Sequence, residues 1–93
     1  MANRITCINK NPRNDPYNRI AHVGFLTAEG ATGKISQEET IQYIERGYIF
    51  YVEVGARRVS VIVARSRYGN KYIKTEADND EPNNLLSLPE CIG

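Results

Sequence analysis

The sequence predicts one small α+β domain, in which an antiparallel β-sheet of four to five strands is packed by one α-helix. Two observations predict this fold class. Residues 48–76 read as three strand-like runs joined by two short turns. Residues 36–39, Ser-Gln-Glu-Glu, match the capping box that opens a helix. Because the chain has only 93 residues, we expect a single domain over residues 1–93 with one modest core.

The first turn of the 48–76 stretch fixes a β-hairpin. Residues 55–56, Gly-Ala, form a two-residue loop with glycine first, which is typical of a type II′ turn. A slip of one residue would turn the valines to water, so the pattern and the turn agree on one register. Counting outward from the loop gives the predicted pairs Val54–Arg57, Val52–Val59, Phe50–Val61 and Tyr48–Val63 on an apolar face, and Glu53–Arg58, Tyr51–Ser60 and Ile49–Ile62 on a wetter face.

The second turn allows two interpretations. A three-residue loop at 68–70 places Ile73 opposite Arg65 on the apolar face. A two-residue loop at 69–70 would place Ile73 opposite Ser66 on the wetter face instead. We favour the three-residue loop, with its asparagine in the left-handed conformation.

The remaining elements follow from local composition. Residues 4–9 and 20–26 are strand-like, whereas 9–18 and 27–34 are rich in turn residues and predict loops. A helix of about three turns is predicted over Gln37–Arg46, with Gly47 as the residue that ends it.

The apolar stripe of this helix is narrow, because only Ile41 and Ile44 share it. We therefore expect the helix to lie on the valine face of the hairpin that follows. Near the C-terminus, residues 83–84, Asn-Asn, predict a turn or cap. The leucines of residues 85–88 are expected to return across the sheet or to seal a contact between subunits, because burial of one leucine is worth roughly 1.5–3 kcal/mol.

Charge and hydropathy exclude few classes of protein. The formal net charge is +1, which gives no global reason to expect nucleic acid or a membrane as partner. No stretch approaches the roughly 20 apolar residues of a membrane-spanning helix, and the N-terminus lacks the apolar run of a signal peptide. We therefore expect a cytoplasmic protein, in which Cys7 and Cys91 are free thiols, while a disulfide between them stays open as the less favoured alternative.

Charge is nevertheless unevenly distributed. Residues 57–74 hold six of the twelve lysines and arginines, with tyrosines among them. Arginine presents a planar fork to phosphate, and a tyrosine ring can stack on a base. The candidate ligand-binding residues are Arg58, Arg65, Arg67, Tyr68, Lys71, Tyr72 and Lys74. The alternative is a charged hairpin edge that is simply solvated and pairs with the acidic helix and tail.

Other chemical signatures are weak. His22 is the chain's single histidine, and no nucleophile or orienting partner stands beside it in the sequence, so it predicts no catalytic site. A metal site of Cys7, His22 and Cys91 lacks a fourth ligand and paired spacing. Residues 78–81 resemble the start of a calcium loop but lack its glycine and distal glutamate. We expect no catalytic residues, no metal and no cofactor.

Six stretches carry a family resemblance: residues 5–8, 19–24, 36–41, 50–55, 72–78 and 84–91. The most specific are Asn-Leu-Leu-Ser-Leu-Pro-Glu-Cys at 84–91 and Tyr-x-Lys-Thr-x-x-Asp at 72–78. Over nearly its whole length the chain resembles the small bacterial and phage proteins of domain-of-unknown-function family 3892. That family often has Trp in place of Ser60 and Gly in place of Phe25, which bears on surface contacts. The resemblance implies a compact β-rich domain and no activity.

These observations favour a non-enzymatic binding protein that sequesters a small phosphate-bearing ligand of nucleotide type. In a phage, such a protein would act against host defence signalling. Because a chain of this size has little room for a deep pocket, a homo-oligomer would help to build one. The alternatives are a protein-interaction module that takes a strand at its sheet edge, and a single-stranded nucleic-acid binder, which is less favoured. No membrane partner is expected.

Overall fold

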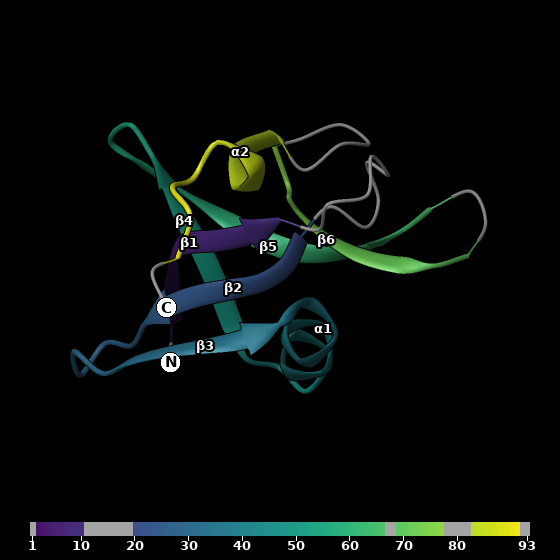
Figure 1. The fold of residues 1–93 in the computed structure, drawn as a ribbon, viewed down its shortest axis with the longest axis horizontal. Helices are drawn as coiled ribbons and strands as arrows, with labels where there is room; N and C mark the ends of the chain where they lie inside the picture. The colour runs from purple at the N-terminus through teal and green to yellow at the C-terminus, as the bar shows by residue number, and fades with distance from the viewer. Residues whose placement is uncertain (1, 11–19, 67–68, 78–82, 92–93) are drawn as a thin grey trace.

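The computed structural model describes residues 2–10, 20–66, 69–77 and 83–91. Within these residues the elements in chain order are β1 (Ala2–Lys10), β2 (Ile20–Leu26), β3 (Thr32–Ser36), α1 (Gln37–Glu45), β4 (Ile49–Val54), β5 (Arg57–Arg65), β6 (Lys71–Thr75) and α2 (Asn83–Leu86). The strands form one sheet in the order β3-β2-β1-β4-β5-β6 (Figure 1). The α+β class is therefore confirmed.

The sheet differs from the predicted one in two ways. It has six strands in the described part of the chain, not four or five, and it is mixed, because β1 and β4 pair in parallel over Ala2–Arg4. The additional strand is β3, which lies in a segment predicted to be a loop. Its polar Thr-Gly-Lys sequence does not look like a strand, although it forms an edge strand of the sheet. A Cβ at Gly33 would come within 2.7 Å of the Phe25 ring. The glycine there makes room for that ring.

The first hairpin has the predicted register. The observed pairs are Tyr51–Ser60, Val52–Val59, Glu53–Arg58 and Val54–Arg57. Gly55 has a φ of 63°, as the first residue of a II′ turn requires. Phe50, Val52 and Val61 are buried, so the apolar face is the core face.

The predicted register of the second hairpin is wrong by two residues. The last pair is Arg65–Lys71, and Ile73 lies opposite Val63 instead of Arg65. The loop is longer than expected because Ser66 N–H donates to Asn70 O at 2.8 Å and Gly69 N–H donates to Ser66 O at 2.9 Å. Gly69, with a φ of 84°, takes the left-handed conformation that we had predicted for Asn70. A shift of two residues preserves side-chain parity, so Ile73 is still buried in the core.

The helix begins where the sequence predicts. Ser36 Oγ accepts a hydrogen bond from Glu39 N–H, and Glu39 Oε1 accepts one from Ser36 N–H, both at 3.1 Å, which completes the capping box. The helix ends one residue early, with Arg46 as its C-cap. It packs mainly against β6, β2, β3 and β5, so it spans both halves of the sheet and not the β4–β5 hairpin alone.

The sheet bends around a single core. Figure 1 shows β1, β2 and β3 side by side, with β4 crossing them and leading into β5 and β6. The rings of Phe25 on β2 and Phe50 on β4 meet edge to face with centroids 5.9 Å apart, although these strands are not neighbours. The buried core residues come from five strands and both helices: Ile5, Ile8, Ile20, Val23, Ile41, Phe50, Val52, Val61, Ile73 and Leu85.

The C-terminal segment returns across the sheet, as one of the two predicted alternatives has it. Asn84 and Leu85 belong to the short helix α2 and not to a turn. Leu85 is fully buried, and Asn84 Nδ2 donates to Thr75 Oγ1 on β6 at 2.9 Å. The expectation of free thiols is wrong, because Cys7 and Cys91 form a disulfide. It rested on the expected compartment, whereas the fold brings these two Cα atoms to 5.0 Å.

Candidate functional site

A hollow of about 750 Å³ opens between the start of β2, one side of α1 and the start of β6. Its volume lies within the range of roughly 300–1,000 Å³ that is usual for small-molecule sites. Ile20 and Ile41 contribute apolar wall. The polar side chains that line it are His22, Ser36, Gln37, Glu38, Gln42, Glu45, Asn70 and Lys71.

Helix periodicity explains why α1 supplies so many of these side chains. Residues 38, 41, 42 and 45 lie three or four apart and therefore share one side of the helix. The same side approaches β6, since Ile41 enters the core that contains Ile73. The hollow thus lies at the solvent-exposed edge of the contact between α1 and β6.

Gln37 is the most buried polar side chain of this wall, with a relative exposure of 9%. Its Oε1 accepts a hydrogen bond from Ile73 N–H at 3.2 Å. That bond anchors β6 to the first turn of α1 and fixes the orientation of the amide. It leaves Nε2 as a donor at the wall of the hollow.

Lys71 lines the hollow from β6, and its side chain reaches α1. Its Nζ lies 2.6 Å from Glu45 Oε2, and both side chains are more than one third exposed. Ion pairs of this exposure contribute about 0–1 kcal/mol to stability. A charged ligand can therefore separate Lys71 from Glu45 at little expense to the fold.

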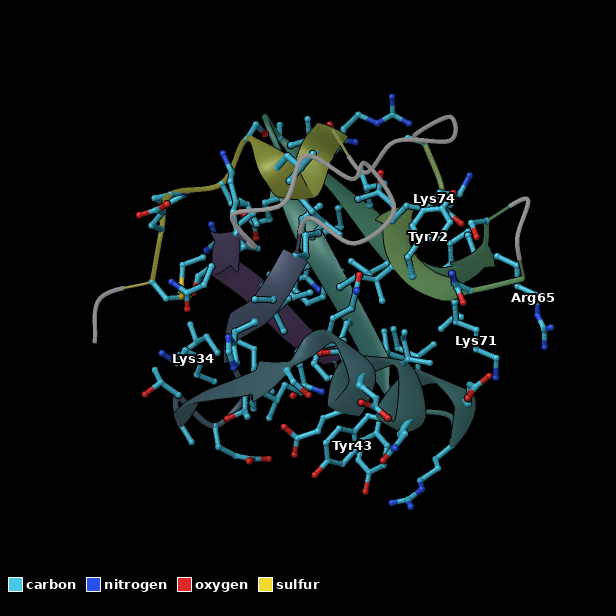
Figure 2. All side chains as sticks on the ribbon, turned by 45° about the vertical axis from the view of Figure 1, so that its right-hand side comes forward. Lys34, Tyr43, Arg65, Lys71, Tyr72 and Lys74 are labelled. Atoms are coloured by element: carbon cyan, nitrogen blue, oxygen red, sulfur yellow. A yellow bond between two sulfur atoms is a disulfide. The ribbon has the colours of Figure 1, made fainter. Side chains whose placement is uncertain are left out.

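The structure does not bring the seven candidate residues together. Arg67 and Tyr68 lie outside the described residues. Lys71 lines the hollow, and Arg65, its cross-strand partner, is exposed at the end of β5. Figure 2 shows Arg65 and Lys71 at one end of β6.

The other three candidates lie elsewhere on the sheet. Tyr72 and Lys74 alternate with Lys71 along β6 and so point to its opposite face. Tyr72 is only 3% exposed, so its ring is not free to stack on a ligand. Arg58 lies on the first hairpin with its guanidinium 4.5 Å from the centre of the Tyr51 ring.

Several residues of the hollow were missed from the sequence. In the sequence His22 predicts no catalytic site, and Gln37, Gln42 and Glu45 have no assigned role beyond the predicted helix. The helix pattern shows which of these share a face, but it does not show that β6 closes against that face. Lys71 contacts Glu45 in the observed register of the second hairpin, which differs by two residues from the predicted register.

Within the described ranges, no group of three or more His, Cys, Asp or Glu side chains is placed to hold a metal ion. The weighed site of Cys7, His22 and Cys91 is excluded, because both sulfurs are joined to each other. The calcium-like residues 78–81 lie outside the described part of the chain. No described helix has the length and apolar character to cross a membrane.

Comparison with known proteins identifies the family. A family model described as "Protein of unknown function (DUF3892)" matches residues 4–89. The chain belongs to this family. Neither a curated protein nor a solved structure is significantly similar to the DUF3892 chain described here. Membership is consistent with the resemblance of the motifs at 5–8, 19–24 and 84–91. The fold places residues 5–8, 20–24 and 84–91 next to one another around the disulfide.

Proposed function

We propose that this DUF3892 protein is a non-enzymatic binding protein for a small phosphate-bearing ligand of nucleotide type, held in the hollow beside α1. One observation carries the proposal: a hollow of ligand size is lined by the Lys71 ammonium and by the amides of Gln37 and Gln42. Lys71 is also the candidate residue from the basic hairpin that lines this hollow.

The charges of the wall decide how such a ligand lies. Glu38 and Glu45 repel a phosphate, and Glu45 Oε2 lies 2.6 Å from the Lys71 ammonium, so a phosphate binds Lys71 when that ion pair opens. Arg65, the cross-strand neighbour of Lys71, attracts the phosphate away from the helix. The phosphate therefore sits at the β5–β6 end. The base faces the helix, where carboxylates accept hydrogen bonds from its amino groups and the Gln37 amide donates to its acceptors.

The same wall favours binding over catalysis. Ser36, at the β3–α1 junction, lines the hollow with a hydroxyl group. Its Oγ already caps the helix by accepting a hydrogen bond from Glu39 N–H. His22 is exposed on β2, and no nucleophile is hydrogen-bonded to it among the described residues. A general base needs a partner within hydrogen-bond reach to activate.

Calorimetric titration with mononucleotides and cyclic dinucleotides tests the proposal. Lys71→Ala should weaken binding about ten-fold or more at low salt, since a lost charge-assisted hydrogen bond of about 1.5–3 kcal/mol exceeds the 1.4 kcal/mol of a ten-fold change. Lys34→Ala is the matched control, because Figure 2 shows Lys34 on the opposite side of the molecule from Lys71. Equal affinity of the two variants, or no binding by wild type, would contradict the proposal.

A second candidate, a protein-interaction surface, is favoured by one exposed apolar cluster. Tyr43 on α1 and Tyr48 beside β4 contact each other edge to face with centroids 5.1 Å apart, and Ile49 follows at 52% exposure. Aromatic residues of this kind are enriched at interfaces. If the cluster joins two copies of the chain, light scattering will give twice the monomer mass for wild type and the monomer mass for Tyr48→Ser. A monomeric wild type would remove this candidate for self-association.

The cytoplasmic location stays part of the proposal. A nucleotide signal is a ligand of the cytoplasm. A reducing cytoplasm would reduce the Cys7–Cys91 disulfide.

A further inference from the structure

The last described residues of the chain pair with the second half of β1, on the side of β1 that faces away from β2. β1 pairs with β4 only over Ala2–Arg4, so its second half presents an open edge on that side. The segment 89–91 lies along this edge. Ile8 N–H donates to Pro89 O and Cys91 N–H donates to Ile8 O, both at 3.0 Å, and Ile8 and Glu90 form a parallel bridge.

The disulfide fastens the segment at its end. Cys7 precedes Ile8 on β1, and Cys91 follows the bridge, so the covalent bond closes directly over the two hydrogen bonds. Asn9 Nδ2 adds a donation to Cys91 O at 3.3 Å. A segment that is held by three hydrogen bonds opens readily unless something else holds it.

One polar atom of β1 beside the segment is unsatisfied. Asn9 Oδ1 is buried and has no hydrogen-bond partner among the described residues. A buried acceptor without a partner favours any opening that returns it to water. The covalent bond holds the segment closed beside this atom.

Gly24 on β2 lies beneath the bond. A Cβ at this position would overlap Cys7 Sγ and lie 2.8 Å from Cys91 Sγ. The glycine thus leaves the space that the joined sulfurs occupy. Both cysteines are half-buried, so a small reductant can reach them.

We propose that the Cys7–Cys91 disulfide is a redox latch that releases segment 89–91 from β1 when it is reduced. A dithiol supplies two electrons and two protons. One thiolate of the reductant attacks a cysteine sulfur and displaces the other cysteine. The second thiol of the reductant then closes its own disulfide and frees the first cysteine. Leu85 and Asn84 stay anchored in the core and on Thr75, so the release stops short of α2.

Hydrogen exchange followed by NMR tests the latch in the full chain. In each sample, the exchange rates of the Ile8 and Cys91 amides are divided by those of the β4–β5 hairpin amides, which cancels any general loss of stability. On reduction with dithiothreitol this ratio should rise about ten-fold or more, because local opening replaces global unfolding as the route of exchange. An unchanged ratio would overturn the proposal, and so would two reactive thiols in the untreated protein.

Two variants keep the result independent of the reductant. Cys91→Ser should show the raised ratio without dithiothreitol and should not respond to it. Gly24→Ala should be reduced at a lower dithiol concentration than wild type, because its methyl group crowds the joined sulfurs and not the separated thiols. A Cys91→Ser protein with the wild-type ratio, or a Gly24→Ala disulfide as resistant as that of wild type, would contradict the latch.

Discussion

At the scale of the residue, Val61 shows how a single side chain reports on the core. It is 4% exposed and belongs to the cluster that holds Phe50 and Ile73. Val61→Ala should lower the free energy of unfolding by roughly 1–3 kcal/mol, through lost burial and the cavity left behind. Val54→Ala, on the same hairpin but 42% exposed, is the control and should change it by less than about 0.5 kcal/mol. Urea unfolding that ranks the two variants equally would show that this face is not the core.

Ser36 makes a second residue-scale test, because one hydroxyl caps α1. Ser36→Ala removes the acceptor of Glu39 N–H and should destabilise the protein by about 0.5–2 kcal/mol. The same change at Ser60, an exposed strand position, serves as the comparison. Equal denaturation midpoints for Ser36→Ala and wild type would mean that the cap contributes nothing to stability.

At the scale of the element, local signals in the sequence predict what they encode directly. The II′ turn at residues 55–56 and the capping box at 36–39 each specify their geometry through neighbouring residues, and both predictions are confirmed. Strand β3 was missed, because its strand character comes from pairing with β2 and not from its own polar residues. The parallel β1–β4 pair also escaped, since it joins residues nearly fifty apart through the crossover helix α1.

The candidate site follows the same division. Lys71 was identified from the sequence, but its position against Glu45 was not. The predicted register of the second hairpin was wrong by two residues, because the hydrogen bonds within the turn were not predicted. Tyr72 was interpreted as a stacking ring because alternation alone does not tell an exposed strand face from a covered one. Gln37 looked like a helix surface position until β6 was seen to donate to its side chain.

A double-mutant cycle measures the tie between α1 and β6. Because Lys71 and Glu45 are partly exposed, their coupling should be no more than about 1 kcal/mol and should shrink as salt is added. The cycle compares unfolding of Lys71→Ala, Glu45→Ala and the double variant. A larger, salt-independent coupling would mean that the pair is desolvated, and separation by a ligand would then be expensive.

At the scale of the whole molecule, the disulfide closes a loop with a sequence separation of 84 residues. On the chain-entropy argument, closing a loop of that length stabilises the folded state by about 4.5 kcal/mol. Urea unfolding of the oxidised and reduced proteins should therefore differ by roughly 2–5 kcal/mol. Identical curves would show that the disulfide does not stabilise the protein by restricting the unfolded chain. They would leave the local release of the C-terminal segment to be judged by hydrogen exchange.

We propose that the hollow beside α1 holds a nucleotide. The most direct test is an NMR titration of the oxidised wild-type protein with adenosine and guanosine monophosphates and a cyclic dinucleotide. The amide signals of His22, Gln37, Gln42 and Lys71 should move together and saturate, while those of Arg58 and Lys74 stay in place. Movement confined to Arg58 and Lys74, or no movement with any of these ligands, would contradict the claim.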